Sequence, residues 1–89
     1  VPVEDVVIYA NEKVFNYIFT KPLHESQIIK RELLPDGRRE IDLKVKDNYE
    51  LRALLRSFGS QIEVIKPESQ RNKMKEDVLA LSRMYEDKE

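Results

Sequence analysis

Two segments in the first half of the chain carry patterns of apolar residues that are typical of β-strands. Residues 6–9 read Val-Val-Ile-Tyr, and consecutive apolar residues of this kind are typical of a central strand covered on both faces. Within residues 40–46, Ile41, Leu43 and Val45 alternate with charged positions. This alternation predicts a strand with one buried face and one face in water.

Two further strands are indicated by short apolar runs. Residues 27–33 come before a Pro-Asp-Gly sequence at residues 35–37, and these three residue types suit the fixed and positive φ values of a tight turn. The turn makes residues 27–33 and 40–46 the two arms of a hairpin. Residues 61–65 predict a fourth, shorter strand.

Helical spacing marks the segments between these strands. Asn11 can cap a first helix over residues 12–20, in which Val14, Phe15, Ile18 and Phe19 repeat at three and four residues. Asp47 and Glu50 stand three apart as a capping-box-like pair before a second helix, which Gly59 ends. The apolar face of this second helix consists of Leu51, Leu54, Leu55 and Phe58. We predict that these four residues share one core with Ile41, Leu43 and Val45.

A third helix is predicted over residues 68–86, after Pro67, whose missing N–H group is not needed in a first helical turn. Four of its apolar residues, Met74, Val78, Leu81 and Tyr85, lie within about 60° of the helix circumference at 3.6 residues per turn. Charged residues flank this narrow stripe, which needs a partner surface. We therefore predict an interaction surface made of Met74, Val78, Leu81 and Tyr85.

The order of the elements is strand, helix, strand, strand, helix, strand, helix. With right-handed crossovers and one hairpin, this order predicts an α+β fold, a ferredoxin-like split βαββαβ sandwich with an additional C-terminal helix. The first and third strands would be central. Both crossover helices would then cover one face of the sheet and leave the other face open.

Composition limits the chain to one small domain over residues 1–89. The 89 residues carry 16 Lys and Arg against 17 Asp and Glu, and no apolar run approaches the roughly 18 residues that would span a bilayer. The chain contains no Cys, which fits a reducing, cytoplasmic setting. Because it begins with Val1, we expect a module of a longer protein.

Candidate catalytic groups are few, and we predict no enzyme, no catalytic residue, no metal site and no cofactor. His24 is the only His and lies in a polar connection without ligands at a recognisable spacing. Glu40 and Asp42 project from one strand face at a separation of about 7 Å. Their alternating strand explains them as solvated positions, without apolar surroundings that would raise a pKa.

Basic residues gather along the predicted hairpin, at Lys30, Arg31, Arg38, Arg39, Lys44 and Lys46. Such a patch can contact the phosphates of a nucleic acid by charge. A hairpin edge that is protected by Lys and Arg against unwanted strand pairing has the same appearance. The second interpretation is the more economical one, because the total charge of the chain is only −1.

The order of short motifs resembles a known family. Residues 54–71 read LLRSFGSQIEVIKPESQR, in which a helix closes with an apolar residue and Gly, a strand follows, and Pro opens the last helix. This pattern is similar to the C-terminal extension, or WCX domain, of bacterial WYL-domain transcriptional regulators. The Pro-Leu-His-Glu-Ser-Gln stretch at 22–27 and the Asp-Gly hairpin agree with it. Gln70 stands where the family more often has an apolar residue.

The resemblance implies a noncatalytic regulatory and dimerisation module at the C-terminal end of a longer regulator. Its expected partners are a second copy or the parent WYL domain, with DNA bound by an N-terminal domain outside this chain, a possible nucleic-acid effector, and no membrane. Two other classes stay open from the residues alone. One is a ferredoxin-like sensor of small ligands, and the other is an accessory nucleic-acid-binding module that uses the basic hairpin.

Overall fold

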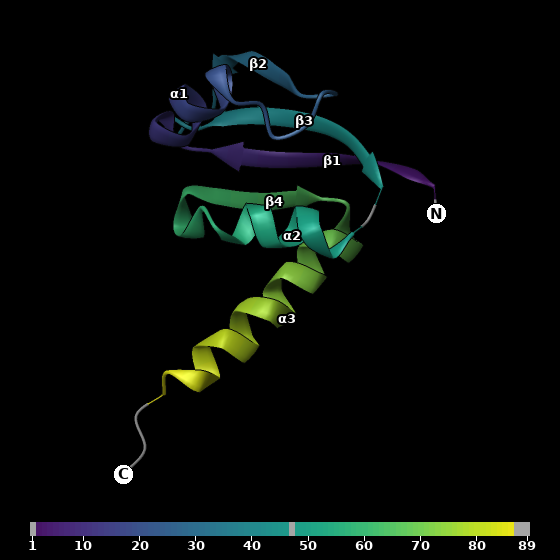
Figure 1. Cartoon of the computed structure of the whole chain (residues 1–89). Helices are drawn as coiled ribbons and strands as arrows, with labels where there is room; N and C mark the ends of the chain where they lie inside the picture. The colour runs from purple at the N-terminus through teal and green to yellow at the C-terminus, as the bar shows by residue number, and fades with distance from the viewer. Residues whose placement is uncertain (1, 47, 87–89) are drawn as a thin grey trace.

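The computed structural model describes residues 2–46 and 48–86 of the chain. Within these residues, three helices and four strands lie in the predicted order, with one additional 3₁₀ turn (Figure 1). The elements are β1 (Val3–Ala10), α1 (Glu12–Thr20), β2 (Ile28–Leu33), β3 (Arg39–Lys46), α2 (Tyr49–Arg56), the 3₁₀ turn η1 (Gly59–Gln61), β4 (Ile62–Lys66) and α3 (Glu68–Met84).

The four strands form one antiparallel sheet in the order β2-β3-β1-β4. Strands β1 and β3 are central, as predicted, and pair along their whole length from Val3 opposite Lys46 to Ala10 opposite Arg39. The α+β class, the antiparallel sheet and the additional C-terminal helix are therefore confirmed.

The sheet differs in detail from an ideal ferredoxin-like βαββαβ sandwich. Strand β2 pairs with β3 only at Ile28, Ile29 and Leu33, because the register shifts between Ile29 and Leu33. A second register shift lies between Val7 and Ile8, where β1 pairs with β4. The turn η1 is inserted before β4, and the C-terminal half of α3 runs away from the sheet (Figure 1).

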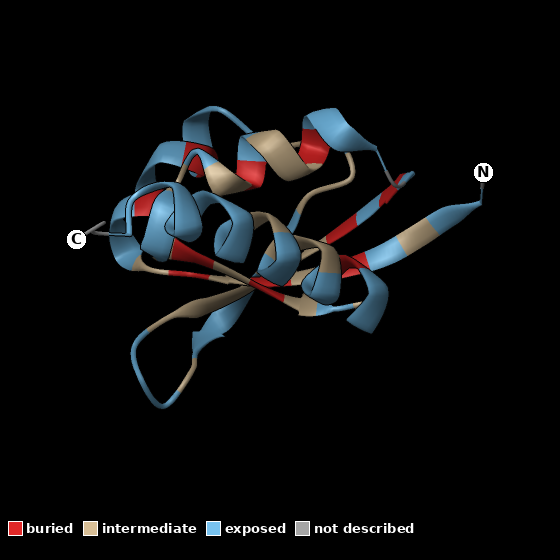
Figure 2. Cartoon of the chain, turned by 90° about the horizontal axis from the view of Figure 1, so that it is seen from below, coloured by how far each residue is buried: buried red, intermediate tan, exposed pale blue. Residues whose placement is uncertain are grey.

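The core lies between the sheet and helices α1 and α2, where the buried positions concentrate (Figure 2). Every second residue of the central strands faces it, since side chains alternate along a strand. Val14 and Ile18 of α1 and Leu51 and Leu55 of α2 pack against these strand residues. The strands contribute Val6, Ile8, Ala10, Ile41, Leu43, Val45, Ile62 and Val64.

The prediction that Leu54 lies in the core is wrong. Its side chain is 40% exposed, although Leu51 and Leu55 are buried. The side chain of Leu54 lies about 80° around the helix from the centre of that buried pair at 3.6 residues per turn. Helix α2 also ends at Arg56, two residues earlier than predicted, so Phe58 packs against the core from the following turn and is only partly buried.

Strand β1 is buried on one face rather than two, which corrects the prediction for residues 6–9. Val6 and Ile8 are buried, whereas Val7 and Tyr9 are half-buried. The helices cover only the face of Val6 and Ile8. The other face of the sheet is open, as the single helical layer predicted.

Asn residues cap both crossover helices. Asn11 accepts a hydrogen bond from the Val14 N–H at 3.0 Å, as predicted. In α2 the cap is Asn48, whose Oδ1 accepts from the Leu51 N–H at 2.6 Å. Asp47, which the sequence suggested as the cap, lies outside the described residues. Gly37 and Gly59 have φ values of 88° and 60°, the left-handed conformation expected for the turn and the helix stop.

Candidate functional site

The open face of the sheet carries charged and aromatic side chains instead of a second apolar layer. Tyr9 pairs with Glu40 of β3 on one side and with Glu63 of β4 on the other, and Val7 pairs with Asp42. Directly paired residues point to the same face of a sheet. Strands β3, β1 and β4 therefore present three carboxylates beside Tyr9 and Val7.

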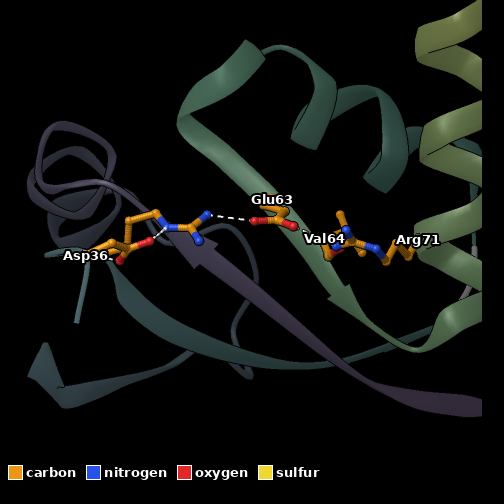
Figure 3. Close-up of polar contacts among 5 residues, drawn as sticks. Asp36, Glu63, Val64 and Arg71 are labelled. Carbon is orange, nitrogen blue, oxygen red and sulfur yellow. Dashed lines mark hydrogen bonds and ion pairs between the residues drawn. The ribbon is translucent and has the colours of Figure 1, made fainter. Parts of the chain in front are cut away.

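A chain of alternating charges crosses this face from the hairpin to α3 (Figure 3). Arg38 Nε donates to Asp36 Oδ2 at 2.6 Å, and Arg38 Nη1 donates to Glu63 Oε1 at 2.8 Å. Arg71 Nη1 donates to the other Glu63 oxygen and to the Val64 carbonyl, both at 2.8 Å. Glu63 thus joins the hairpin turn to the first turns of α3.

The arginines change the acidity of their partners. Hydrogen bonds from Arg38 and then from Arg71 hold the pKa of Glu63 below its ordinary value. The pKa of Asp36 is lowered by the backbone N–H and the side chain of Arg38. Arg38 also lies over the Tyr9 ring, 5.2 Å from its centroid, which is within cation–π range.

Glu40 and Asp42 are neighbours on the open face of β3. The pKa of Glu40 is raised above its ordinary value, chiefly by its interaction with the Asp42 carboxyl group and then by burial. Lys30 Nζ lies 3.3 Å from Asp42 Oδ2. Glu40 therefore departs from the prediction of a solvated position without a raised pKa.

The six basic residues of the hairpin do not form one continuous patch. Lys30 and Arg38 have acidic partners on the open face. Arg39 has the parity of the core-facing residues, and its guanidinium lies 4.4 Å from the centroid of the Phe15 ring and donates to the Arg31 carbonyl at 2.6 Å. Arg31, Lys44 and Lys46 are exposed.

Arg39 has a structural role that the sequence did not suggest. The register shift in β2 leaves a gap in its pairing with β3, and the guanidinium of Arg39 donates to the Arg31 carbonyl beside that gap. An open depression of about 590 Å³ lies along the same hairpin, lined by Lys30, Arg31, Glu32, Leu33, Leu34, Pro35 and Glu40.

The predicted stripe on α3 is divided into two parts. Met74 is partly buried and packs against the core of its own chain. Val78, Leu81 and Tyr85 are 52%, 51% and 79% exposed, because the C-terminal half of α3 runs away from the sheet (Figure 1). Apart from Met74, the stripe therefore has no cover from the described part of this chain.

Three polar side chains anchor the first half of α3. Gln70 is only 3% exposed, and its Nε2 donates to Glu4 Oε2 at 3.4 Å. Arg71 binds Glu63, and Asp77 lies 2.6 Å from Arg56 of α2. The polar Gln70 thus replaces an apolar contact with a hydrogen bond to β1. No pattern in the sequence indicated the partners of Arg71 and Asp77, because each of these pairs joins two separate elements.

His24 belongs to a local turn. Its Nδ1 accepts from the Ser26 N–H at 3.1 Å and lies 2.8 Å from Ser26 Oγ. Ser26 Oγ is in turn hydrogen-bonded to the backbone of Lys44 at 2.8 and 3.1 Å. In residues 2–46 and 48–86, no three His, Asp or Glu side chains come together as metal ligands, and no helix is long and apolar enough to cross a membrane.

These contacts define a small α+β module whose C-terminal helix is anchored to the rest of the domain only through its first half. The model of the WCX domain family matches residues 2–82, almost the whole of the described chain. The chain therefore belongs to the WCX domain family, whose members are C-terminal extensions of WYL-domain regulators. No curated protein matches the chain.

Proposed function

We propose that this chain is a noncatalytic regulatory and oligomerisation module of a WYL-type bacterial transcriptional regulator. The module comprises residues 1–89, acts in the cytoplasm, and associates with a second copy or with its parent WYL domain. Family membership supports the regulatory context. The element order and the central β1 and β3 support a ferredoxin-like description with an added helix.

The observation that carries the proposal is the exposed end of α3. Val78, Leu81 and Tyr85 lie on the face that packs Met74 against the core, and Leu79 and Met84 are also exposed. Burying a Val or Leu side chain contributes about 1.5–3 kcal/mol. Because association also costs translational and rotational freedom, a few such residues on each partner predict a weak, reversible contact.

The two other function classes receive less support. A small-ligand sensor needs an enclosed, mostly apolar pocket, whereas the depression along the hairpin is open and lined largely by charged residues. Nucleic-acid contact needs available cations. Lys30, Arg38 and Arg39 already have partners within the described chain, and the exposed basic residues of the predicted patch are Lys30, Arg31, Lys44 and Lys46.

Sedimentation of the chain over a range of concentrations tests the proposal. We expect the weight-average mass to rise with concentration, and Leu81→Ser to suppress that rise. Leu79→Ser is the matched control, because Leu79 is similarly exposed but lies about 130° around the helix from the stripe at 3.6 residues per turn. A chain that stays monomeric and does not bind the separately produced WYL domain would refute the proposal.

A further inference from the structure

A small hollow lies on the helix side of the sheet, between α1 and the turn end of the β2–β3 hairpin (Figure 1). Its volume is about 160 Å³. It is a different space from the open depression of about 590 Å³ along the same hairpin, with which it shares Leu33. The hollow is lined by Glu12, Phe15 and Asn16 of α1 and by Leu33, Gly37 and Arg39 of the hairpin.

The guanidinium of Arg39 is held in place on the hairpin wall of this hollow. It lies 4.4 Å from the centroid of the Phe15 ring, and Phe15 in turn contacts Phe19, with 6.0 Å between the ring centroids. Arg39 Nη1 donates to the Arg31 carbonyl at 2.6 Å. A guanidinium that is already fixed in this way loses little further freedom when it binds a ligand.

Arg39 has no carboxylate partner among the described residues. The guanidinium groups of Arg38, Arg56 and Arg71 each have a nitrogen within 2.8 Å of a carboxylate oxygen. The hydrogen bonds of Arg39 instead run from Nη1 to backbone carbonyls. Because a guanidinium donates through a planar fork that matches a carboxylate, Nε and Nη2 of Arg39 can bind a carboxylate from outside the chain.

Glu12 places a negative charge on the helix wall of the same hollow. It is an exposed residue in the first turn of α1. In residues 2–46 and 48–86 its carboxylate forms no ion pair, either with Arg39 or with another cation. A cation and an anion that line one hollow without binding each other complement a ligand that carries both charges.

The remaining surface of the hollow suits a short apolar group. Phe15 and Leu33 contribute apolar side chains, and Leu33 is 59% exposed. The volume equals that of about five water molecules at roughly 30 Å³ each, well below the roughly 300–1,000 Å³ of sites for larger ligands. The matching ligand is therefore a small molecule with a carboxylate, an ammonium group and a short apolar side chain.

We propose that this hollow binds a small apolar α-amino acid. The carboxylate of the amino acid accepts hydrogen bonds from Arg39, its ammonium group donates to Glu12, and its side chain lies against Leu33. A bound amino acid thereby joins α1 to the hairpin, whose arm β2 is incompletely paired. The site goes beyond the proposed function and does not depend on self-association, because no residue of α3 lines it.

Titration of the isotope-labelled chain with L-valine, followed through its amide chemical shifts, tests the site. We expect the amides of Asn16, Leu33 and Gly37 to shift and to saturate at millimolar concentrations. Two analogues each remove one charge, since isovalerate lacks the ammonium group of valine and L-valinamide lacks its carboxylate. Each analogue should bind about tenfold more weakly, the factor that corresponds to one charge-assisted hydrogen bond.

Glu12→Gln distinguishes a built site from a general effect of charge. This variant should bind L-valine about tenfold more weakly but should bind isovalerate at least as well as the wild type does, because the repulsion between two carboxylates is removed. Glu76→Gln is the control, since it makes the same charge change at an exposed position of α3, and its affinity for L-valine should be unchanged.

Arg39→Gln should abolish binding of both L-valine and isovalerate, and its amide spectrum shows whether the fold is kept. If this variant does not fold, the two analogues and Glu12→Gln still decide the matter in the folded chain. Shifts that do not saturate, shifts that lie away from the hollow, or equal affinities for L-valine and either analogue would overturn the inference. None of these outcomes bears on sedimentation of the chain, which tests the proposed function separately.

Discussion

Two apolar surfaces of this domain differ in whether the chain itself buries them. The residues between the sheet and helices α1 and α2 are buried within the chain, with Ile8, Ile18 and Ile41 fully inaccessible. The stripe on the free half of α3, the residues 78–85 that run away from the sheet, has comparable side chains. Its Val78, Leu81 and Tyr85 are at least half exposed. The first surface spans two layers of one fold, whereas the second begins on the core at Met74 and continues past the edge of the body.

Because of this difference, substitutions on the two surfaces should affect two different processes, folding and association. Side chains of the core lose contact with water when the monomer folds, so their truncation lowers the free energy of unfolding. Side chains of the free stripe lose contact with water only in an assembly. Their truncation should therefore change the mass of the assembly and leave the stability of the monomer nearly unchanged.

The largest expected effect is in the core. Leu55→Ala should lower the free energy of unfolding by about 2–5 kcal/mol, because it leaves a cavity beneath α2. Leu54→Ala is the matched control on the same helix, since Leu54 is 40% exposed and Leu55 only 2%. Chemical denaturation measures both values. Equal losses for the two variants would contradict the orientation of α2.

A smaller effect is expected for the charge chain that anchors α3. Glu63→Gln should destabilise the domain at pH 7 by about 0.5–1 kcal/mol, because exposed ion pairs contribute little. The lowered pKa of Glu63 means that this stabilisation is present above the unfolded pKa of about 4.3 and is lost as the pH falls through the folded value. In denaturation at pH 7 and pH 3, the difference between wild type and variant should thus be smaller at pH 3 than at pH 7.

The acid pair on the open face should have a small effect of opposite sign. Glu40 has a raised pKa, so its contribution to stability is present at low pH and is lost as the pH rises through the folded pKa. Glu40→Gln removes the negative charge beside Asp42 at every pH. We expect a gain of a few tenths of a kcal/mol at pH 7, within the range of surface pairs. A loss at pH 7 would contradict an unfavourable interaction between the two acids.

The smallest change in monomer stability is expected on the free stripe. Leu81→Ser at low protein concentration should alter the free energy of unfolding by less than about 0.5 kcal/mol, which is typical of exposed positions. The same variant should suppress self-association at high concentration. A loss of 2 kcal/mol or more in dilute solution would mean that Leu81 belongs to the core of the monomer, and the comparison between the two surfaces would fail.

The strands and helices could be predicted because their signals are local. The alternation of Ile41, Leu43 and Val45 and the Asn11 cap act within a few residues, and the structure confirms them. Leu54 was misplaced because its spacing fits a helical face whose width depends on the neighbouring strands. The end of burial between Met74 and Val78 depends on the direction in which α3 leaves the sheet, which no pattern within α3 can indicate.

The polar contacts could be predicted least. Arg38 and Glu63 are 25 residues apart in the chain, and charged residues are so frequent here that no pair is distinguished by its spacing. Arg39 appeared to be part of a basic patch, yet its parity on β3 directs it to Phe15 and to the bulged strand β2. Such partners follow from the sheet register and become visible only with the fold.

Amide hydrogen exchange along α3 at two protein concentrations tests the central claim most directly. Amides of residues 70–77 should be protected at both concentrations, because this half is anchored to the body. Amides of residues 79–84 should exchange rapidly in dilute solution and become protected as the concentration rises. Exchange in residues 79–84 that is the same at both concentrations would contradict the claim that the free half of α3 is a self-association surface.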